Sequence, residues 1–273
     1  MRVFQSPLEL KNELRSLDAS IGFVPTMGAL HNGHISLIKK AKEQNEIVVV
    51  SIFVNPTQFL KGEDLDKYPR REQADRRVCE LAGVDYLFYP NADDIYGKDE
   101  VTVCAPNVRG YILEGTSRPG HFSGVLTVVM KLLNIVNPKN AYFGKKDAQQ
   151  LNLITLMVKQ MFMDVNIVPV DTMRDANGLA LSSRNEYLTP IEKEEALKIP
   201  LSLKKATNMV MSGIYDVKRI KEEMTNILLP NEISYVAIVS REFEPLEKVI
   251  PGNSIVLVEA VVGSTRLLDN IWL

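Results

Sequence analysis

The sequence predicts an α/β fold, a Rossmann-like doubly wound parallel sheet followed by a smaller C-terminal α+β domain. Short apolar runs alternate with amphipathic helical segments through most of the chain, as a parallel sheet requires. The run at residues 47–54 is almost continuously β-branched, which is typical of a strand covered on both faces. After residue 189 the pattern changes to long helical segments followed by strands that alternate like an antiparallel sheet.

The first elements form a strand–helix–strand unit. Residues 1–17 are expected to form an amphipathic helix, and residues 21–25 a buried strand. Apolar residues recur at helical spacing over 33–42, so a helix is expected there before the strand at 47–54. Strands joined in this way pair in parallel.

The same alternation continues to the end of the first domain, which we place at residues 1–184. Helices are expected at 70–82, 122–136 and 148–161, and strands at 84–89, 141–143 and 165–170. In the second domain, residues 185–273, we expect helices at 190–211 and 217–229 and strands at 233–239, 255–262 and 266–271. Pro200 should break or kink the first of these helices, because proline lacks a backbone N–H.

Composition excludes several classes of protein. The formal net charge of -2 argues against a nucleic-acid partner. The longest apolar runs are interrupted by Ser51 or Lys131, so no membrane-spanning segment is predicted, and the charged N-terminus does not resemble a signal peptide. We therefore expect a cytoplasmic protein. Cys79 and Cys104 lack the spacing of a zinc site or a disulfide framework and are expected to be buried free thiols.

Two of the three histidines, His31 and His34, lie in one turn where a helix is expected to begin. The loop before this turn contains Gly28, which lets backbone approach a ligand closely. The first turn of a helix has unpaired N–H groups and a positive dipole end, both of which suit phosphate. Two imidazoles on one side of that turn could donate hydrogen bonds to a phosphate. This pattern predicts a nucleotide site; the alternative is a pair of surface histidines.

Two further segments carry groups suited to phosphate. Gly144, Lys145, Lys146 and Asp147 lie between a predicted strand and helix, at the carboxyl end of a strand, where α/β folds bind ligands. Asp147 could cap that helix or bind ribose hydroxyls, and an N-capped helix behind a charged turn is the alternative. The second segment, residues 181–185, offers two hydroxyls and a guanidinium to an anion; its alternative is a solvated loop.

A third kind of chemistry follows the strand at 47–54. Asn55 and Gln58 carry amides, which suit a substrate hydroxyl or carboxylate; the alternative is a proline turn with an internally bonded Gln58. His121 precedes the long helix at 122–136, and we expect it to cap that helix or to be structural rather than catalytic.

Five segments, taken in order, carry a family resemblance: residues 25–34, 54–59, 114–122, 143–150 and 175–185. In their residues, order and spacing they resemble the pantothenate synthetase (pantoate–β-alanine ligase) family of the nucleotidylyl transferase superfamily. The resemblance covers essentially the whole chain. One departure is Leu60-Lys61-Gly62, where the family usually has Gly-Pro-Asn, so the conformation of this loop is left open.

The resemblance implies ATP-dependent condensation of (R)-pantoate and β-alanine to pantothenate, a step toward coenzyme A, through a pantoyl adenylate and with release of AMP and diphosphate. It implies that ATP is a substrate, that Mg²⁺ is carried on the ATP phosphates without a protein metal site, and that the protein is a homodimer whose C-terminal domain acts as a lid. His31, His34, Lys146 and Arg184 are then catalytic, Gln58 and Gln150 bind pantoate, and Gln58 also binds β-alanine. The implied ATP-binding residues are Met27, Gly28, Ala29, Leu30, His31, Asn32, Gly33, His34, Gly144, Lys145, Lys146, Asp147, Met173, Leu181, Ser182, Ser183 and Arg184.

Other interpretations compete with this one. A nucleotidyltransferase of the same superfamily would share the histidine turn but would keep AMP on its product. A catalytically silent nucleotide-binding module would lack turnover altogether. A relative of the class I aminoacyl-tRNA synthetases is disfavoured by the net charge and by the absence of a segment large enough to bind an anticodon.

Overall fold

The computed structural model describes residues 1–273, which divide into two compact units. The N-terminal unit comprises Met1–Lys145 and Leu153–Asp171, and the C-terminal unit comprises Lys146–Asn152 and Thr172–Leu273. The boundary expected after residue 184 therefore falls within the second unit. The reason is that residues 146 and 174 form hydrogen bonds with the last strand of the chain, as described below. Whether residue 184 divides the chain functionally stays a prediction.

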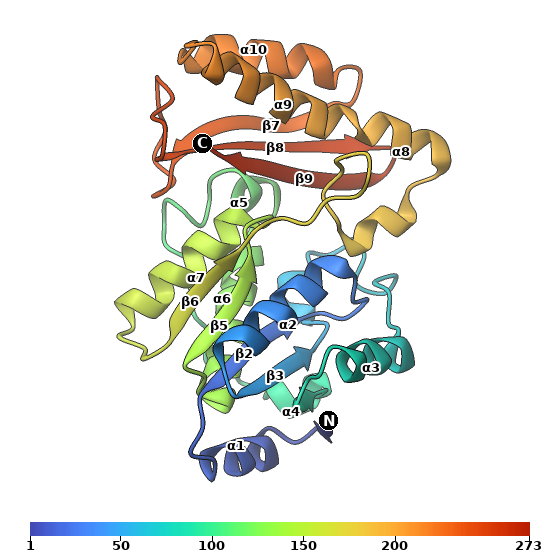
Figure 1. Cartoon of the computed structure of the whole chain (residues 1–273), viewed down its shortest axis with the longest axis vertical. Helices are drawn as coiled ribbons and strands as arrows, with labels where there is room; N and C mark the ends of the chain where they lie inside the picture. Colours follow the sequence, from blue (N-terminus) through green and yellow to red (C-terminus); the bar gives the residue numbers. More distant parts are fainter. The chain divides into compact units, whose positions relative to one another are not determined.

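The N-terminal unit is built on a six-stranded parallel sheet in the order β1-β4-β3-β2-β5-β6. Strands β3, β2, β5 and β6 of this sheet are labelled in Figure 1. This topology confirms the doubly wound α/β class, because the strand order reverses direction between β2 and β5. The strands are β1 (Arg2–Phe4), β2 (Ile21–Thr26), β3 (Ile47–Ile52), β4 (Tyr86–Phe88), β5 (Asn140–Gly144) and β6 (Asn166–Val170).

Helices cover this sheet. Leu37, Ile38 and Ala41 of α2 and Cys79 of α3 form one core layer with strand residues such as Val50, while α6 packs against β2 and against α1. The long helices of this unit are α1 (Pro7–Arg15), α2 (Asn32–Gln44), α3 (Glu72–Leu81), α6 (His121–Val136) and the part of α7 (Ala148–Gln160) from Leu153 onward. Short pieces at α4 (Ala92–Ile95), α5 (Glu114–Ser117) and η1 (Pro56–Gln58) complete the unit.

The helix expected over residues 1–17 is wrong at its start. Ser6 accepts a hydrogen bond from the N–H of Glu9 and Pro7 follows it, a pattern that begins a helix at Pro7 and no earlier. The residues before it form β1, which pairs with β4 at the edge of the sheet. Three residues are too few to show a strand period in the sequence.

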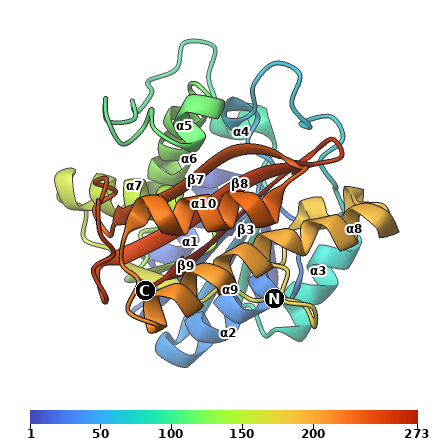
Figure 2. The same ribbon diagram turned by 90° about the horizontal axis from the view of Figure 1, so that it is seen from above.

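The C-terminal unit is a three-stranded antiparallel sheet with two helices on it, as predicted. Strands β7 (Glu232–Ser240), β8 (Ser254–Val262) and β9 (Thr265–Trp272) pair in sequence order. Figures 1 and 2 show α9 (Lys198–Met211) and α10 (Val217–Leu228) side by side over one face of the sheet. Apolar residues of both helices, including Leu203 and Met224, are buried against strand residues such as Val258.

The break expected near Pro200 occurs at Leu197, between α8 (Pro190–Ala196) and α9. Pro200 itself lies in the first turn of α9, where the N–H groups have no partner within the helix, so its missing donor costs nothing. Thr189 caps α8 and pairs reciprocally with Glu192. A 3₁₀ turn, η2 (Ser183–Tyr187), precedes α8.

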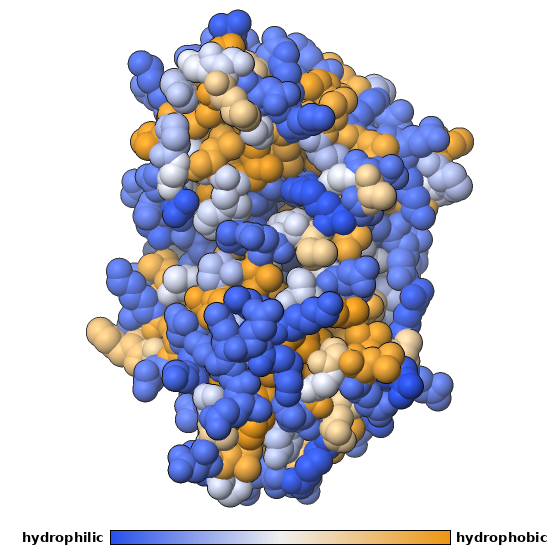
Figure 3. Space-filling view, in the orientation of Figure 1, coloured by the Kyte–Doolittle hydropathy of each residue, from blue (hydrophilic) through white to orange (hydrophobic).

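The two cysteines have different environments. Cys79 is buried as expected, but Cys104 is exposed, so its predicted burial is wrong. Residues 101–106 form no strand of the sheet, which leaves the Cys104 side chain outside the core. No helix of the chain combines the length and apolar character needed to cross a bilayer. The face seen in Figure 3 shows hydrophilic residues interspersed with hydrophobic ones.

Candidate active site

Three of the segments singled out from the sequence meet at one edge of the parallel sheet. Strand β2 ends at Thr26, which is paired with Ile52 at the end of β3. On its other side β2 is aligned with β5 through Phe23 and Ala141, so these strands end at the same edge. The loops that leave this edge carry residues 27–34, 55–58 and 144–145. This is the switch point of the sheet, where open α/β folds bind ligands.

The two histidines of the first loop form a reciprocal cap at the start of α2. The N–H of Gly33 donates to Nδ1 of His31 at 3.1 Å, and the N–H of His31 donates to Nδ1 of His34 at 3.2 Å. Their ring centroids lie 4.1 Å apart. Because both Nδ1 atoms accept a backbone N–H, each neutral ring carries its hydrogen on Nε2. The turn therefore holds two imidazoles in the tautomer whose Nε2–H is a hydrogen-bond donor.

Backbone N–H groups are less available in this loop than the sequence suggests. The N–H of Gly33 is already donated to His31, and those of Ala29 and Leu30 are donated to the carboxylate of Asp75. The expectation of unpaired N–H groups in the first turn of the helix is therefore wrong for Gly33. Side chains capping a helix start, rather than water, satisfy the donors here.

The amide segment after β3 divides into one structural and one available side chain. Asn55 is buried, with its Nδ2 donating to Oε1 of Gln58 at 3.0 Å and to the carbonyl of Gly124 at 3.2 Å. Its Oδ1 accepts from the hydroxyls of Tyr96 and Thr57. Asn55 is thus fully used in holding the turn. Gln58 is left with its Nε2 against the sulfur of Met27 at 3.1 Å, a weak acceptor that a ligand oxygen could replace.

A buried ionic network holds the backbone of Gln58. Nδ1 of His121 lies 2.8 Å from the Gln58 carbonyl oxygen, and the guanidinium of Arg118 donates to the same oxygen at 3.3 Å and to Nε2 of His121 at 3.0 Å. Arg118 also forms a two-pronged pair with Glu63, at 2.8 and 2.6 Å. His121 is therefore structural, in agreement with the sequence interpretation.

The loop whose conformation the sequence left open is a tight turn. The N–H of Glu63 donates to the carbonyl of Leu60 at 3.0 Å, and the N–H of Leu60 donates back to the Glu63 carboxylate. Gly62 has φ of 91°, a conformation that favours glycine. The turn thus places Glu63 where it can pair with Arg118.

The C-terminal unit gathers a second group of predicted residues around β9. Met173 and Leu181 face each other across a hairpin, with the Leu181 N–H donating to the Met173 carbonyl at 2.9 Å. Arg174 of this hairpin pairs with the buried carboxylate of Asp269 at 2.5 and 2.9 Å. The neighbouring Asn270 donates to the carbonyl of Lys146 at 2.7 Å. Strand β9 therefore fixes both the hairpin and the backbone of Lys146.

The remaining predicted residues lie as follows. Lys145 forms an ion pair with Asp171 at 2.6 Å, and Lys146 approaches Asp147 at 3.2 Å. The side chain of Gln150 is half-buried and makes no hydrogen bond. Arg184 lies in η2, where its N–H donates to the Ser182 hydroxyl at 3.3 Å.

The predicted residues are divided between the two units. The N-terminal unit holds Met27, Gly28, Ala29, Leu30, His31, Asn32, Gly33, His34, Gln58, Gly144 and Lys145. The C-terminal unit holds Lys146, Asp147, Gln150, Met173, Leu181, Ser182, Ser183 and Arg184.

Sequence reasoning missed the residues that hold these groups: Asp75, Glu63, Asp269 and Asn270. Asp75 stands in a run of charged residues, so nothing in the sequence separates it from a solvated helix face. Arg118 lies within a segment that carries the family resemblance, and that was the one available signal for its importance.

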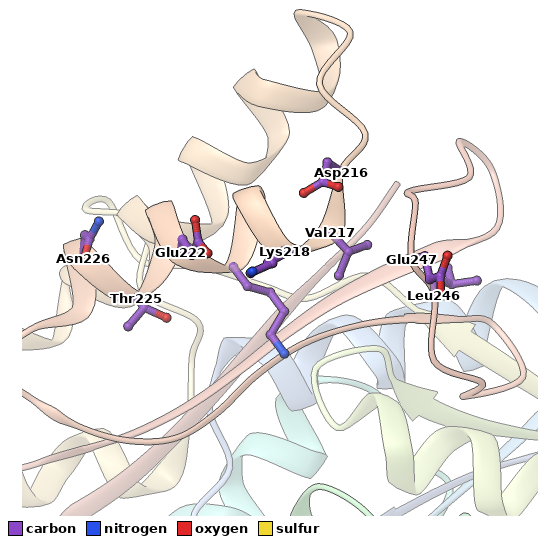
Figure 4. A pocket seen from close by; sticks show the side chains of 9 residues that line it. Asp216, Val217, Lys218, Glu222, Thr225, Asn226, Leu246 and Glu247 are labelled. Atoms are coloured by element: carbon purple, nitrogen blue, oxygen red, sulfur yellow. The ribbon is translucent and has the colours of Figure 1, made fainter.

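An open groove in the C-terminal unit contains none of the predicted site residues. It has a volume of about 860 Å³ and is lined by residues of α10 and by Leu246 and Glu247 (Figure 4). Lysine and carboxylate side chains, among them Lys218 and Glu222, both line it. This mixed lining favours neither a negatively nor a positively charged ligand.

Comparison with known proteins identifies the family. A family model described as pantoate–β-alanine ligase matches residues 2–272. The pantothenate synthetase of Sulfurimonas denitrificans is 68% identical over 273 residues, covering 100% of both chains. A pantothenate synthetase structure from Thermus thermophilus has a TM-score of 0.95 at 38% identity, covering 99% of each chain. The pantoate–β-alanine ligase of Francisella tularensis, complexed with β-γ ATP and β-alanine, has a TM-score of 0.84 at 39% identity, covering 100% of this chain and 97% of that one.

Proposed function

The chain belongs to the pantoate–β-alanine ligase family, and on this premise we propose that it joins (R)-pantoate to β-alanine with ATP, releasing AMP and diphosphate. The observation that carries the proposal is the contact between Gln58 and Met27. It places an amide donor from the loop after β3 against the loop that leads to His31 and His34. A carboxylate held by that amide would lie beside a turn suited to phosphate.

The first step must make the pantoate carboxylate reactive, because hydroxide is a poor leaving group at neutral pH. We propose that Gln58 and Gln150 hold pantoate while its carboxylate attacks the α-phosphorus of ATP and diphosphate leaves. The Nε2–H groups of His31 and His34 are fixed donors for the negative charge that grows on the phosphoryl oxygens. Lys146 and Arg184 are proposed to neutralise the same charge.

In the second step the amine of β-alanine attacks the acyl carbon of the adenylate, and the acyl–oxygen bond breaks to release AMP. Gln58 is proposed to border the β-alanine site as well. His34 is proposed to supply a proton to the leaving oxygen, consistent with the hydrogen that its tautomer places on Nε2. Because the mixed anhydride is sensitive to water, we propose that residues 185–273 act as a lid.

The remaining ATP contacts are proposed from the motif positions, including Gly144, Lys145, Asp147, Met173 and Leu181 to Ser183. Mg²⁺ is proposed to arrive bound to the ATP phosphates. No group of three or more histidine, cysteine or carboxylate side chains gathers to hold a metal ion. The groups that the proposed site does present are mostly imidazoles, amides and cations, which are not the oxygen ligands that Mg²⁺ prefers. We also propose that the protein is a homodimer and that it is cytoplasmic. The molecular mass of the protein in solution tests whether it is a dimer.

A turnover assay with (R)-pantoate, β-alanine and ATP tests the proposal. Pantothenate, AMP and diphosphate should form in equal amounts, and omission of either pantoate or β-alanine should abolish free AMP at steady state. A product that retains AMP would instead support a nucleotidyltransferase of the same superfamily. No turnover with any carboxylate would indicate a nucleotide-binding module.

A further inference from the structure

Asp75 is a buried carboxylate with an unusual set of partners. It lies on α3, its residue is 3% exposed, and its two oxygens accept the N–H groups of Ala29 at 2.9 Å and Leu30 at 2.8 Å. No lysine, arginine or histidine lies within ion-pair distance of it. Its negative charge is therefore satisfied by two consecutive peptide groups of one loop.

Such an arrangement needs a reason, because removing a carboxylate from water without a cation is costly. It is more costly here, because the loop that it binds leads to a turn proposed to hold a polyphosphate, and like charges repel. Electrostatics alone would therefore favour a neutral residue at position 75. What the carboxylate supplies is geometry: two strong acceptors at a fixed spacing.

The geometry matters because the loop is bent into a conformation that it does not favour. Gly28 has φ of 86° and Ala29 has φ of 50°, so two successive residues are left-handed. Alanine rarely adopts this region, since its Cβ crowds the following carbonyl. The two hydrogen bonds to Asp75 hold Ala29 in this conformation on both of its peptide groups.

The same bonds decide which groups the loop presents. In a trans peptide the N–H and the preceding C=O point in opposite directions. Since the N–H groups of Ala29 and Leu30 point to Asp75, the carbonyls of Gly28 and Ala29 point away from it. At Gly28 the loop therefore presents a carbonyl acceptor and not an N–H donor, which suits a hydroxyl or amino group rather than phosphate.

We propose that Asp75 is a positioning residue of the nucleotide site, which holds the Gly28–Ala29 turn so that the Gly28 carbonyl accepts a hydrogen bond from the nucleoside part of ATP. The triphosphate is left to the histidine turn and the lysines. This proposal rests on the proposed function, in that the ligand is ATP. It assigns the nucleoside to the Gly28–Ala29 turn and the triphosphate to other groups.

The variant Asp75→Asn tests this directly. Asparagine has the same shape but only one acceptor oxygen, so in either orientation its NH₂ group faces a backbone N–H. We expect a folded protein whose KM and Kd for ATP rise about tenfold or more, while KM for pantoate changes less than about twofold. Inorganic triphosphate, which lacks the nucleoside, should bind equally well to both proteins. The control variant is Asp216→Asn, which changes a carboxylate that caps α10 by accepting one backbone N–H.

Rescue separates positioning from a general loss of stability. Glycine tolerates positive φ, so Ala29→Gly added to Asp75→Asn should recover part of the affinity for ATP. Unchanged ATP affinity in a folded Asp75→Asn protein, or an equal loss for triphosphate and ATP, would overturn the proposal. If Asp75→Asn does not fold, hydrogen exchange of the wild type decides: the amides of Ala29 and Leu30 should be protected without ATP, and fast exchange contradicts the proposal.

The measurements of Kd for ATP and triphosphate test the role of Asp75 independently of the proposed function. If the wild type binds ATP but makes no pantothenate, the ligase proposal fails while the Asp75 proposal is still decided by Kd. If pantothenate is made and ATP affinity does not depend on residue 75, only the Asp75 proposal fails.

Discussion

Nδ1 of His121 lies 2.8 Å from the carbonyl oxygen of Gln58. A carbonyl only accepts, so Nδ1 carries the hydrogen, and the neutral Nε2 accepts from Arg118. This tautomer is the opposite of the one that His31 and His34 adopt. The hydrogen bonds thus divide the three histidines into two with an Nε2–H donor, in the turn at the start of α2, and one that supports the backbone of Gln58.

Replacing Gln58 with glutamate should weaken the use of pantoate. A carboxylate at this position would face the substrate carboxylate, and like charges in contact repel. We expect KM for pantoate to rise by at least about tenfold, with KM for ATP little changed. Initial-rate kinetics with each substrate varied in turn measures this. An unchanged KM for pantoate would place its site elsewhere.

Replacing Arg118 with methionine should destabilise the protein strongly. Both partners of the Arg118–Glu63 pair are mostly buried, with side-chain exposures of 8% and 14%. Removal of one partner of a buried pair leaves the other uncompensated and typically costs about 3–5 kcal/mol. Urea unfolding should show this loss, and the double variant Arg118→Met with Glu63→Gln should recover much of it. Equal stabilities of the single and double variants would show that the charge of Glu63 is not the cause.

The variant His34→Ala should retain the fold and lose turnover. Loss of one donor to transition-state charge typically lowers the rate by about 10²–10³. Steady-state kcat and a circular dichroism spectrum measure the two properties. Lys40→Ala is a suitable control, because Lys40 lies on the same helix but pairs with Glu43 on its exposed side. Near-normal kcat in a folded His34→Ala protein would remove His34 from the mechanism.

Labelled diphosphate should exchange into ATP when pantoate is present and β-alanine is absent. Protein groups, among them His31, His34 and Gln58, are proposed to assist the first step, and β-alanine contributes nothing to it. Adenylation can therefore proceed in both directions without β-alanine. Exchange should disappear without pantoate. A requirement for β-alanine would instead indicate a ternary-complex route and contradict the stepwise mechanism.

One thiol per folded chain should react with a disulfide reagent at a pH of about 8, below the usual pKa of a free thiol. Burial raises the pKa of Cys79 to about 12, so almost none of it is the reactive thiolate under these conditions. Cys104 is exposed and accessible to the reagent. Absorbance should report one fast thiol in buffer and two in denaturant, and Cys104→Ser should remove the fast one. Two fast thiols in the native protein would show that Cys79 is accessible.

The sequence by itself determined the order and type of the long elements. In a helix such as α2 or a strand such as β3, the buried face requires apolar residues at a regular spacing. That spacing can be read directly from the sequence. It also located the histidine turn and Gln58, because helix starts and strand ends have local signatures. The short strand β1 escaped detection, since three residues carry no period.

Only the tertiary structure decided which polar groups are free and which are already bonded. Asn55 and Gln58 look alike in sequence, yet the first is consumed by neighbours as distant as Gly124 and Tyr96. Asp75 is likewise bonded to Ala29 and Leu30, which precede it in the chain by 46 and 45 positions. Hydrogen bonds between segments far apart depend on where the backbone brings them, and no local pattern in the sequence records that distance.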